Sequence, residues 1–524
     1  MVWSWPAQKS IFRPGKCKAL HHLLVSKESG MAFSERDGLM QGAKWALIAN
    51  WYARSIGLVN TIILLKLLKP EDFGIAALST FFVSLFAAFS HVGIGHFVIS
   101  SDSMSKQELD SIWSLGLAVK CVSAILLFFS AGFIADYVNK PEMEAVIHVV
   151  AILPLISGLR NVALDVAEKN YHFKRILAAN MIGKTIGTVV SIMLAIYLES
   201  YWALIIGVIV IALSETVTGY ILFPYRPRLT ASHWSTQWTF SKWLYLSAIF
   251  GYMRSRIDVL ILGNIVDSRS IGLYNIATEF AWLPFMQLVG PMNHGFFAVV
   301  SRVQNEVADF YYRIVKQMSL NMLILVPCGI GLIAIAEPFS GIVLGEEWRD
   351  AAPLLQCMAG LVIVMSSHGL MCSILTVKKQ LKVIIASDAI IIVSIFVVFT
   401  TYHDAGIEQL AQLRFAIGAG FFLWLLMLQR FVIGIKAHDL LFLYLTPAVS
   451  GLVMYLMVVQ TMAMFPSEMW QLCVGVLTGM VVYIPCMLLL AYSFRRWFPY
   501  YWECCEFVLR LIRRNRPAMA VKGG

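Results

Sequence analysis

The apolar residues of this chain are grouped in long stretches of about twenty residues that are separated by short polar connectors. A helix rises 1.5 Å per residue, so roughly 20 apolar residues are needed to cross about 30 Å of hydrocarbon. The stretches are continuous and do not alternate in ten-residue segments, which favours helices over a transmembrane barrel. We therefore predict fourteen spans, at about 42–65, 73–99, 111–135, 145–165, 176–198, 202–223, 243–265, 274–299, 318–339, 353–376, 383–401, 410–429, 440–463 and 471–494.

Composition agrees with a membrane protein. Of the 524 residues, 59% are hydrophobic and 14% are charged, whereas soluble domains carry about 25% charged residues. This excludes a soluble enzyme, a disordered chain and a secreted disulfide scaffold. The nine cysteines include no CxxC and mostly fall inside predicted spans, so we interpret them as small apolar packing residues and predict neither a metal site nor a cofactor. The expected fold class is an all-α integral membrane protein.

Lysine and arginine predict the orientation, because short cytoplasmic loops are enriched in them. If both termini are cytoplasmic, most of these residues fall on the inside, and the outside segments hold only Lys66, Lys69, Lys140, Arg269 and Arg349. This asymmetry accounts for most of the net charge of +10, so we do not interpret the charge as a sign of nucleic-acid binding.

The two terminal segments differ from the rest. Residues 1–41 form a predicted cytoplasmic extension without the apolar core of a signal peptide, and Met31 and Met40 are alternative translation starts to Met1. Residues 495–524 form a basic tail in which Trp502 and Cys505 recur at helical spacing beside several arginines. We expect an amphipathic helix that lies on anionic lipids.

A short internal repeat divides the apolar part of the chain. Tyr-x-Arg-Ser occurs at 52–55 and at 252–255, and a Gly-apolar pair follows in each case, Gly74-Ile75 and Gly272-Leu273. The offset predicts two six-helix halves in parallel orientation, an arrangement in which transporters bind substrate between the halves. The predicted divisions are an N-lobe at 42–223, a linker at 224–242, a C-lobe at 243–430 and two further helices at 431–494.

Several predicted spans contain charges near mid-membrane. Each costs about 2.5–3.5 kcal/mol on insertion scales, so such a group normally faces a partner or a wet cavity. The candidate substrate-binding cations are Arg54, Lys120, Lys184, Arg254 and Arg256; the acids are Glu215, Asp258, Glu279 and Asp388. One interpretation is a cationic cavity for an anionic group such as a phosphate. The alternative is that these are buried ion pairs or snorkelling side chains that only hold the bundle together.

The seventh span allows a finer prediction. Arg254 and Asp258 are i and i+4, hence able to pair, whereas Arg256 is turned about 200° from Arg254 and faces elsewhere. Asp258 and Glu279 are candidate ligands for a coupling ion, Na⁺ or H⁺, and structural pairing with the arginines is the alternative.

Two motifs then carry a family resemblance. The residues LLKPEDFGI at 67–75, joined by Asp258-x-x-x-x-Gly263 and by IGLYN at 271–275, are similar to those of the Wzx-type oligosaccharide flippases of the multidrug/oligosaccharidyl-lipid/polysaccharide exporter superfamily, including exporters of the colanic-acid and xanthan type. The resemblance covers about residues 40–495.

This resemblance implies a V-shaped, two-lobed bundle that works by alternating access and is not an enzyme. Its substrate would be a polyprenyl-pyrophosphate-linked oligosaccharide, which it would move across the bacterial inner membrane. Other polysaccharide-assembly proteins would be its partners. Arg54 and Arg254 would stand where the family's cationic lumen meets the pyrophosphate. An ion-coupled multidrug antiporter of the same superfamily and a membrane polysaccharide polymerase or ligase are the alternative functions.

Overall fold

The computed structural model describes residues 35–90, 105–169, 173–232, 234–303 and 306–506, and within these ranges all regular secondary structure is helical. Most of the predicted N-terminal extension and the end of the basic tail lie outside the described residues. The helices up to residue 222 form the N-lobe: α2 (Glu35–Leu67), α3 (Pro70–Phe89), α5 (Lys106–Phe129), α6 (Ala131–Tyr137), α7 (Glu142–Val150), α8 (Ile152–Gly158), α9 (Ala163–Lys169), α10 (Phe173–Leu198) and α11 (Trp202–Leu222).

The remaining helices form the C-lobe and two appended helices. The C-lobe contains α12 (Trp234–Ile265), α13 (Ser268–Pro284), η1 (Phe285–Val289), α14 (Gly290–Arg302), α15 (Val307–Ala334), α16 (Ala336–Phe339), η2 (Ser340–Leu344), η3 (Glu346–Ala351), α17 (Ala352–Met365), α18 (His368–Val377), α19 (Leu381–Thr401), α20 (Ile407–Leu428) and η4 (Gln429–Ile433). The appended pair, α21 (Ala437–Met462) and α22 (Glu468–Ser493), packs together and against α15.

Ten segments of the described chain are long and apolar enough to cross a membrane, so the all-helical membrane fold is confirmed. The remaining predicted spans coincide with α2, the short helices α7 and α8, α12, and α13 with η1 and α14. These segments are interrupted or carry more polar residues, and the count of fourteen stays a prediction.

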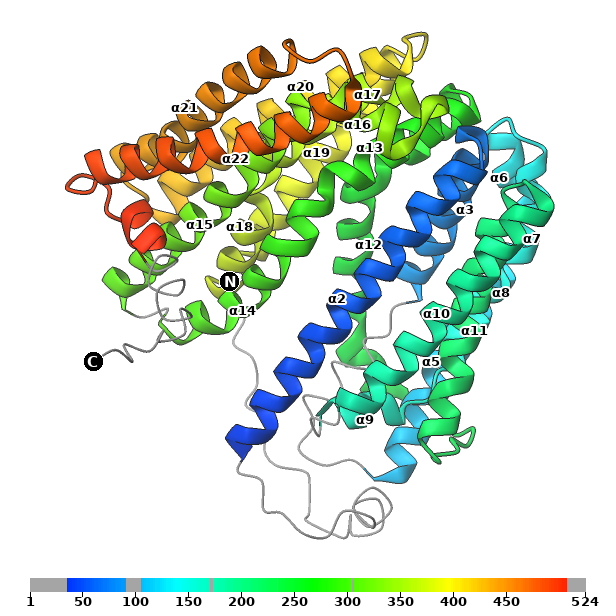
Figure 1. The fold of residues 1–524 in the computed structure, drawn as a ribbon. Coiled ribbons are helices and arrows are strands. Elements are labelled where there is room, and N and C mark those ends of the chain that lie inside the picture. Colours follow the sequence, from blue (N-terminus) through cyan, green and yellow to red (C-terminus); the bar gives the residue numbers. More distant parts are fainter. Residues whose placement is uncertain (1–34, 91–104, 170–172, 233, 304–305, 507–524) are drawn as a thin grey trace, which may run out of the picture.

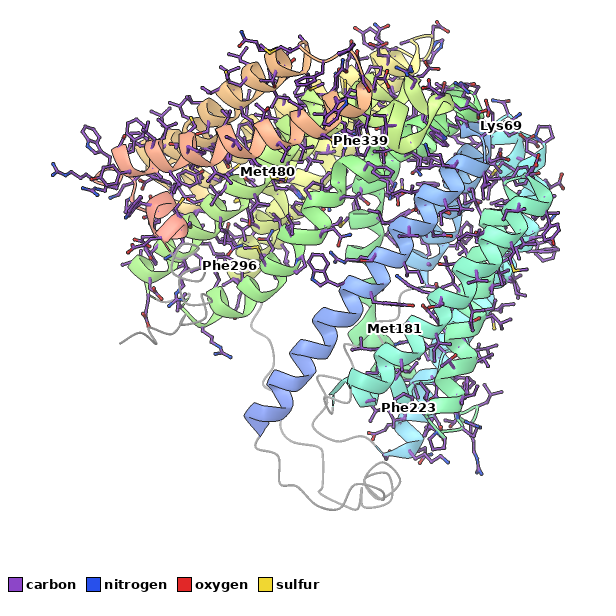
Figure 2. The ribbon with its side chains drawn as sticks, viewed as in Figure 1. Lys69, Met181, Phe223, Phe296, Phe339 and Met480 are labelled. Carbon is purple, nitrogen blue, oxygen red and sulfur yellow. The ribbon has the colours of Figure 1, made fainter. Side chains whose placement is uncertain are left out.

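The two lobes converge at one end of the molecule and diverge toward the other, which gives a V (Figure 1). We call the end where they meet the lobe junction; it is formed by the α2–α3 and α6–α7 turns of the N-lobe and by the α12–α13 turn and η2–η3 of the C-lobe. Figure 2 labels Lys69 at the junction and Phe223 at the far end of the N-lobe.

Two glycines allow the lobes to meet. A Cβ on Gly74 would lie 1.9 Å from the carbonyl oxygen of Ser268, and one on Gly272 would lie 1.9 Å from that of Pro70. Ser268 stands four residues before Gly272, as Pro70 stands before Gly74, so the contact is reciprocal between the two repeats. The Gly-apolar pairs of the sequence repeat therefore mark the crossing of α3 and α13.

The other residues of the LLKPEDFGI motif complete the junction. Pro70 begins α3, where a missing N–H costs nothing, and Asp72 accepts hydrogen bonds from the backbone N–H groups of Lys69 (3.1 Å) and Tyr201 (2.7 Å). Phe73 packs edge-on against Trp348, with ring centroids 5.1 Å apart. The fully buried Trp348 indole N–H donates to the carbonyl of Leu65 at 3.0 Å, so the C-lobe caps the end of α2.

The tail departs from its predicted position. Up to Glu506 it packs on the bundle: Tyr501 and Cys505 are buried, and the Tyr501 hydroxyl donates to the carbonyl of Leu443 at 2.5 Å. Cys505 therefore faces protein and not lipid. Contact of the later residues with anionic lipids stays a prediction, because residues 507–524 lie outside the described chain.

Candidate functional site

A cavity of about 610 Å³ lies between the lobes beneath the junction. It is lined by residues of α2, α3, α7, α8, α10 and α11 on one side and of α12 and α13 on the other. Its polar lining comes from Asn60, Thr61, Ser79, Thr80, Ser84, Ser191, Tyr252, Arg256, Asn275 and Glu279. Amide, hydroxyl and charged groups on an otherwise apolar wall are the chemistry expected of a site that holds a hydroxyl-rich ligand.

Arg256 and Glu279 are the charged residues in this lining. The Arg256 Nη1 atom lies 3.5 Å from the side-chain oxygen of Asn275, a distance at the limit of a hydrogen bond. The Tyr252 hydroxyl donates to the carbonyl of Phe81 on α3 at 2.8 Å and so bridges the lobes at the cavity wall. The structure thus brings two predicted site residues, Arg256 and Glu279, into one inter-lobe cavity.

Arg54 lies between the lobes but not in the lining of this cavity. Its Nη1 donates to the carbonyl of Met286 and to the side-chain oxygen of Gln287, both at 2.6 Å. These acceptors belong to η1, the π-helical turn after Pro284. Pro291 has no N–H, so a carbonyl four or five residues earlier lacks its helical donor. The Arg54 guanidinium supplies that donor from the opposite lobe.

Arg254 faces into the C-lobe and not into the cavity. Its Nε lies 2.9 Å from Oδ1 of Asp388 on α19, and the Arg254 side chain is 26% exposed. The predicted pairing of Arg254 with Asp258 is therefore wrong. The i,i+4 spacing permits that contact, but Arg254 pairs with an aspartate on another helix. The prediction that Arg254 and Arg256 face different ways is confirmed.

Asp258 is instead enclosed by other partners (6% exposed). Oδ2 accepts a hydrogen bond from the Tyr274 hydroxyl at 2.8 Å and lies 3.4 Å from Nε of Arg414 on α20, and Oδ1 accepts from the N–H of Val259 at 2.9 Å. These donors and the Arg414 guanidinium satisfy the carboxylate of Asp258 inside the C-lobe. The neighbours of Asp258 already supply the positive charge and the hydrogen-bond donors, so a coupling ion is not needed to balance this carboxylate.

The two lysines are held within the N-lobe. Lys120 donates to the carbonyl of Ser157 at 3.0 Å, at the end of α8. Lys184 of α10 lies near Glu215 of α11, where their charges interact. Neither lysine lines the cavity.

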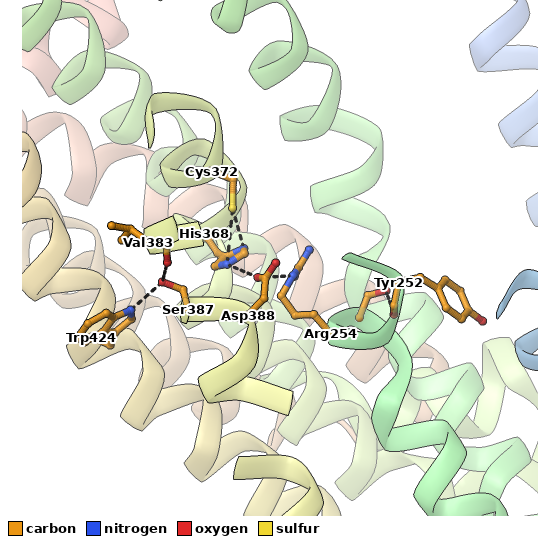
Figure 3. Close-up of polar contacts among 9 residues, drawn as sticks. Tyr252, Arg254, His368, Cys372, Val383, Ser387, Asp388 and Trp424 are labelled. Atoms are coloured by element: carbon orange, nitrogen blue, oxygen red, sulfur yellow. Dashed lines mark hydrogen bonds and ion pairs between the residues drawn. The ribbon is translucent and has the colours of Figure 1, made fainter. Parts of the chain in front are cut away.

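The sequence reasoning missed His368 and Arg414. His368 is 4% exposed, and its Nε2 lies 3.5 Å from the same Oδ1 of Asp388 that contacts Arg254 (Figure 3). A histidine and an arginine inside apolar stretches were the available signal, but their partners lie on other helices. In the described residues no group of three or more His, Cys, Asp or Glu side chains could hold a metal ion.

Comparison with known proteins identifies the family of this chain. The profile of a family described as polysaccharide biosynthesis protein matches residues 63–353, which is more than half of the chain. The chain belongs to this polysaccharide biosynthesis protein family. The matched segment of this chain contains the junction motif, both glycines of the crossing and every lining residue of the cavity except Asn60 and Thr61.

Two curated relatives and one solved structure extend the comparison. The lipopolysaccharide biosynthesis protein WzxC of Escherichia coli (strain K12) is 26% identical over 63% of this chain and 68% of its own length. The succinoglycan biosynthesis transport protein ExoT of Rhizobium meliloti (strain 1021) is 25% identical over 60% of this chain and 64% of its own length. The structure of the lipid II flippase MurJ in an inward closed conformation superposes with a TM-score of 0.70, at 15% identity, over 85% of this chain and 98% of MurJ. The likeness to MurJ supports the fold, and the Wzx-type resemblance of the sequence is confirmed.

Proposed function

We propose that this protein is a flippase that moves polyprenyl-diphosphate-linked oligosaccharides across the bacterial inner membrane for surface polysaccharide synthesis. The observation that carries the proposal is the polar cavity between two repeat-related lobes, closed at one end by the junction. Membership of the polysaccharide biosynthesis family and a transport protein among the relatives favour this function over a multidrug antiporter and over a polymerase or ligase.

The cavity suits the glycan part of such a substrate. Its amides, hydroxyls, Arg256 and Glu279 supply donors and acceptors for sugar hydroxyls. Arg54 and Arg254 are the candidate contacts for the diphosphate, because a guanidinium binds phosphate oxygens through two parallel N–H groups. Each arginine now has another acceptor, so substrate binding would exchange one set of contacts for another.

Complementation tests the proposal. The gene is deleted in its bacterial host and restored as the unchanged protein or as Arg54→Gln, Arg254→Gln or Arg256→Gln at equal membrane levels. Hydrogen bonds to charged groups contribute about 1.5–3 kcal/mol, so we expect surface polysaccharide to fall at least about tenfold for each variant. Lipid-linked oligosaccharide should accumulate on the cytoplasmic leaflet of the deletion strain.

The matched control is Arg495→Gln, which removes an exposed arginine just after α22 and should leave export unchanged. Normal surface polysaccharide in the deletion strain would contradict the proposed function. Full export by all three cavity and inter-lobe variants would leave the flippase in place but remove these arginines from its mechanism.

A further inference from the structure

The cluster of Arg254, His368 and Asp388 carries an inference that deepens the proposed function and rests on it. One carboxylate oxygen, Oδ1 of Asp388, faces two basic groups: Nε of Arg254 at 2.9 Å and Nε2 of His368 at 3.5 Å. Figure 3 shows the three side chains converging from α12, α18 and α19. A single carboxylate balances only one positive charge, so the two bases compete for it whenever the histidine is protonated.

The existing ion pair is incompletely satisfied. Nε of Arg254 and Oδ1 of Asp388 are both buried, yet within the described residues neither makes a hydrogen bond of acceptable geometry. In the second buried pair of the C-lobe, Nη1 of Arg414 also lacks a hydrogen-bond partner among the described residues, but the carboxylate of Asp258 is satisfied because it accepts from Tyr274 and from a backbone N–H. The contact of Arg254 with Asp388 is therefore the one that another cation can replace at low cost.

His368 and Asp388 are held in place by their neighbours, whereas Arg254 lies at the partly exposed edge of the cluster. Trp424 of α20 donates to the hydroxyl of Ser387 at 3.0 Å and fixes α19 beside Asp388, and Phe421 lies against the His368 ring with centroids 5.6 Å apart. Both His368 and Asp388 are nearly inaccessible. Arg254 keeps 26% of its side chain exposed.

Within the described residues, no other charged side chain forms a hydrogen bond or an ion pair with this cluster. On α12, Asp258 is one turn from Arg254 but is held by Arg414 of α20, and Arg256 faces the cavity. On α18, the thiol of Cys372 lies 3.7 Å from Nε2 of His368. On α20, Phe421 and Trp424 are neutral. An added proton on His368 is therefore compensated by Asp388.

We propose that Arg254, His368 and Asp388 form a proton-binding site that couples proton uptake to binding of the anionic head group. A proton from water binds the unprotonated ring nitrogen of His368, and the imidazolium pairs with Asp388. Arg254 leaves the carboxylate and pairs with a phosphate oxygen of the substrate. The charge in the cluster is conserved, since one ion pair becomes two when one proton and one anionic oxygen enter.

Proton linkage predicts how the dissociation constant of the ligand changes with pH. If one proton is taken up for each ligand bound, the dissociation constant rises about tenfold for each pH unit between the pKa of the free site and the higher pKa of the complex. The probe is undecaprenyl diphosphate, which has no sugar. Its binding to the full-length protein is measured by calorimetry between pH 5.5 and 8.5, in buffers of different ionisation enthalpy that report the number of protons taken up.

Three variants test whether His368 is the residue that binds the proton. His368→Asn should abolish both the slope and the proton uptake. Asp388→Asn should release Arg254 permanently and give tight binding that does not vary with pH. Ser373→Ala, which removes a hydroxyl of the same helix that donates to the carbonyl of Gly369, should keep the wild-type slope. Thermal unfolding of each variant, followed in the same preparations, verifies that it is folded.

Three results would overturn the proton site. They are a pH-independent affinity in the unchanged protein, a retained slope in His368→Asn, and no binding of undecaprenyl diphosphate at any pH in the range. Each leaves the proposed function standing if the deletion strain still loses its surface polysaccharide. The proposed function is tested by the surface polysaccharide of the deletion strain, whereas calorimetry tests only the proton site.

Discussion

Gly74 and Gly272 decide at the scale of single residues how closely the two lobes approach. The space a Cβ would need at either position is occupied by a backbone carbonyl of the other lobe. Backbone cannot turn aside as a flexible side chain can, so the lobes would have to separate. This gives the family motif a physical meaning: its glycine lies at the crossing point of two helices.

Gly74→Ala is expected to destabilise the junction. Forcing atoms into a filled contact typically costs about 1–3 kcal/mol, so the variant should unfold at a lower temperature and export less. A thiol-reactive dye reports the unfolding of the purified protein, because Cys504 and Cys505 are buried and free. The control is Gly57→Ala, where nothing lies within 4 Å of the added Cβ. Equal unfolding temperatures for the two variants would show that the crossing tolerates a methyl group.

Sequence reasoning singled out candidate residues in the spans but not their partners. The repeat located Arg54, Arg254 and the two glycines, and depth in the span placed Asp388 among four mid-membrane acids. Partner choice depends on how helices far apart in the chain pack, which periodicity does not report. Arg254 therefore pairs with Asp388 and not with the nearby Asp258.

At the scale of elements, helix ends are joined across the lobes. Lys140, in the turn between α6 and α7, donates from Nζ to the carbonyls of Gly263 at 2.9 Å and Val266 at 3.0 Å. These carbonyls belong to the end of α12, where the helix lacks its own donors and is negatively polarised. Burial lowers the pKa of Lys140, and the carboxylates of Glu142 and Asp267 oppose that effect.

Lys140→Met should weaken this link. The buried carbonyls lose their donor, at a cost of about 1–3 kcal/mol, and the unfolding temperature should fall. Lys69→Met is the control, because Lys69 is exposed at the same junction. If both variants unfold at the wild-type temperature, Lys140 does not hold α12.

Element boundaries could be predicted where the chain is uniformly apolar. The spans from 383 to 494 agree closely with α19 to α22. The fourth and eighth predicted spans were less accurate. The fourth is divided between α7 and α8, and the eighth passes through Pro284 and the π-helical turn η1. Apolar content predicts that a segment enters the membrane, whereas breaks in it depend on backbone donors that neighbouring helices replace.

At the scale of the whole molecule, the junction has an approximate two-fold symmetry in which the charges are complementary. Glu71 follows Pro70 in one repeat and Arg269 follows Ser268 in the other, and their side chains form an ion pair at 3.6 Å. Arg269 also contacts Asp350 of the C-lobe at 3.0 Å. These side chains are partly exposed, so each pair contributes little stability. Such contacts can be broken and remade at little cost in free energy.

If the proposed flippase works by alternating access, this junction separates in every cycle, and a covalent link across it should therefore stop transport. In the double variant Glu71→Cys/Arg269→Cys, a short bismaleimide should join the two lobes and abolish flipping in proteoliposomes, measured as protection of the glycan from a membrane-impermeant glycosidase. The unchanged protein and each single variant, treated with the same reagent, control for reaction at the native cysteines. Mass spectrometry of the joined peptides verifies the link. Undiminished flipping by fully cross-linked protein would mean that the substrate crosses without opening of the junction, because the ends of α3 and α13 could then no longer move apart.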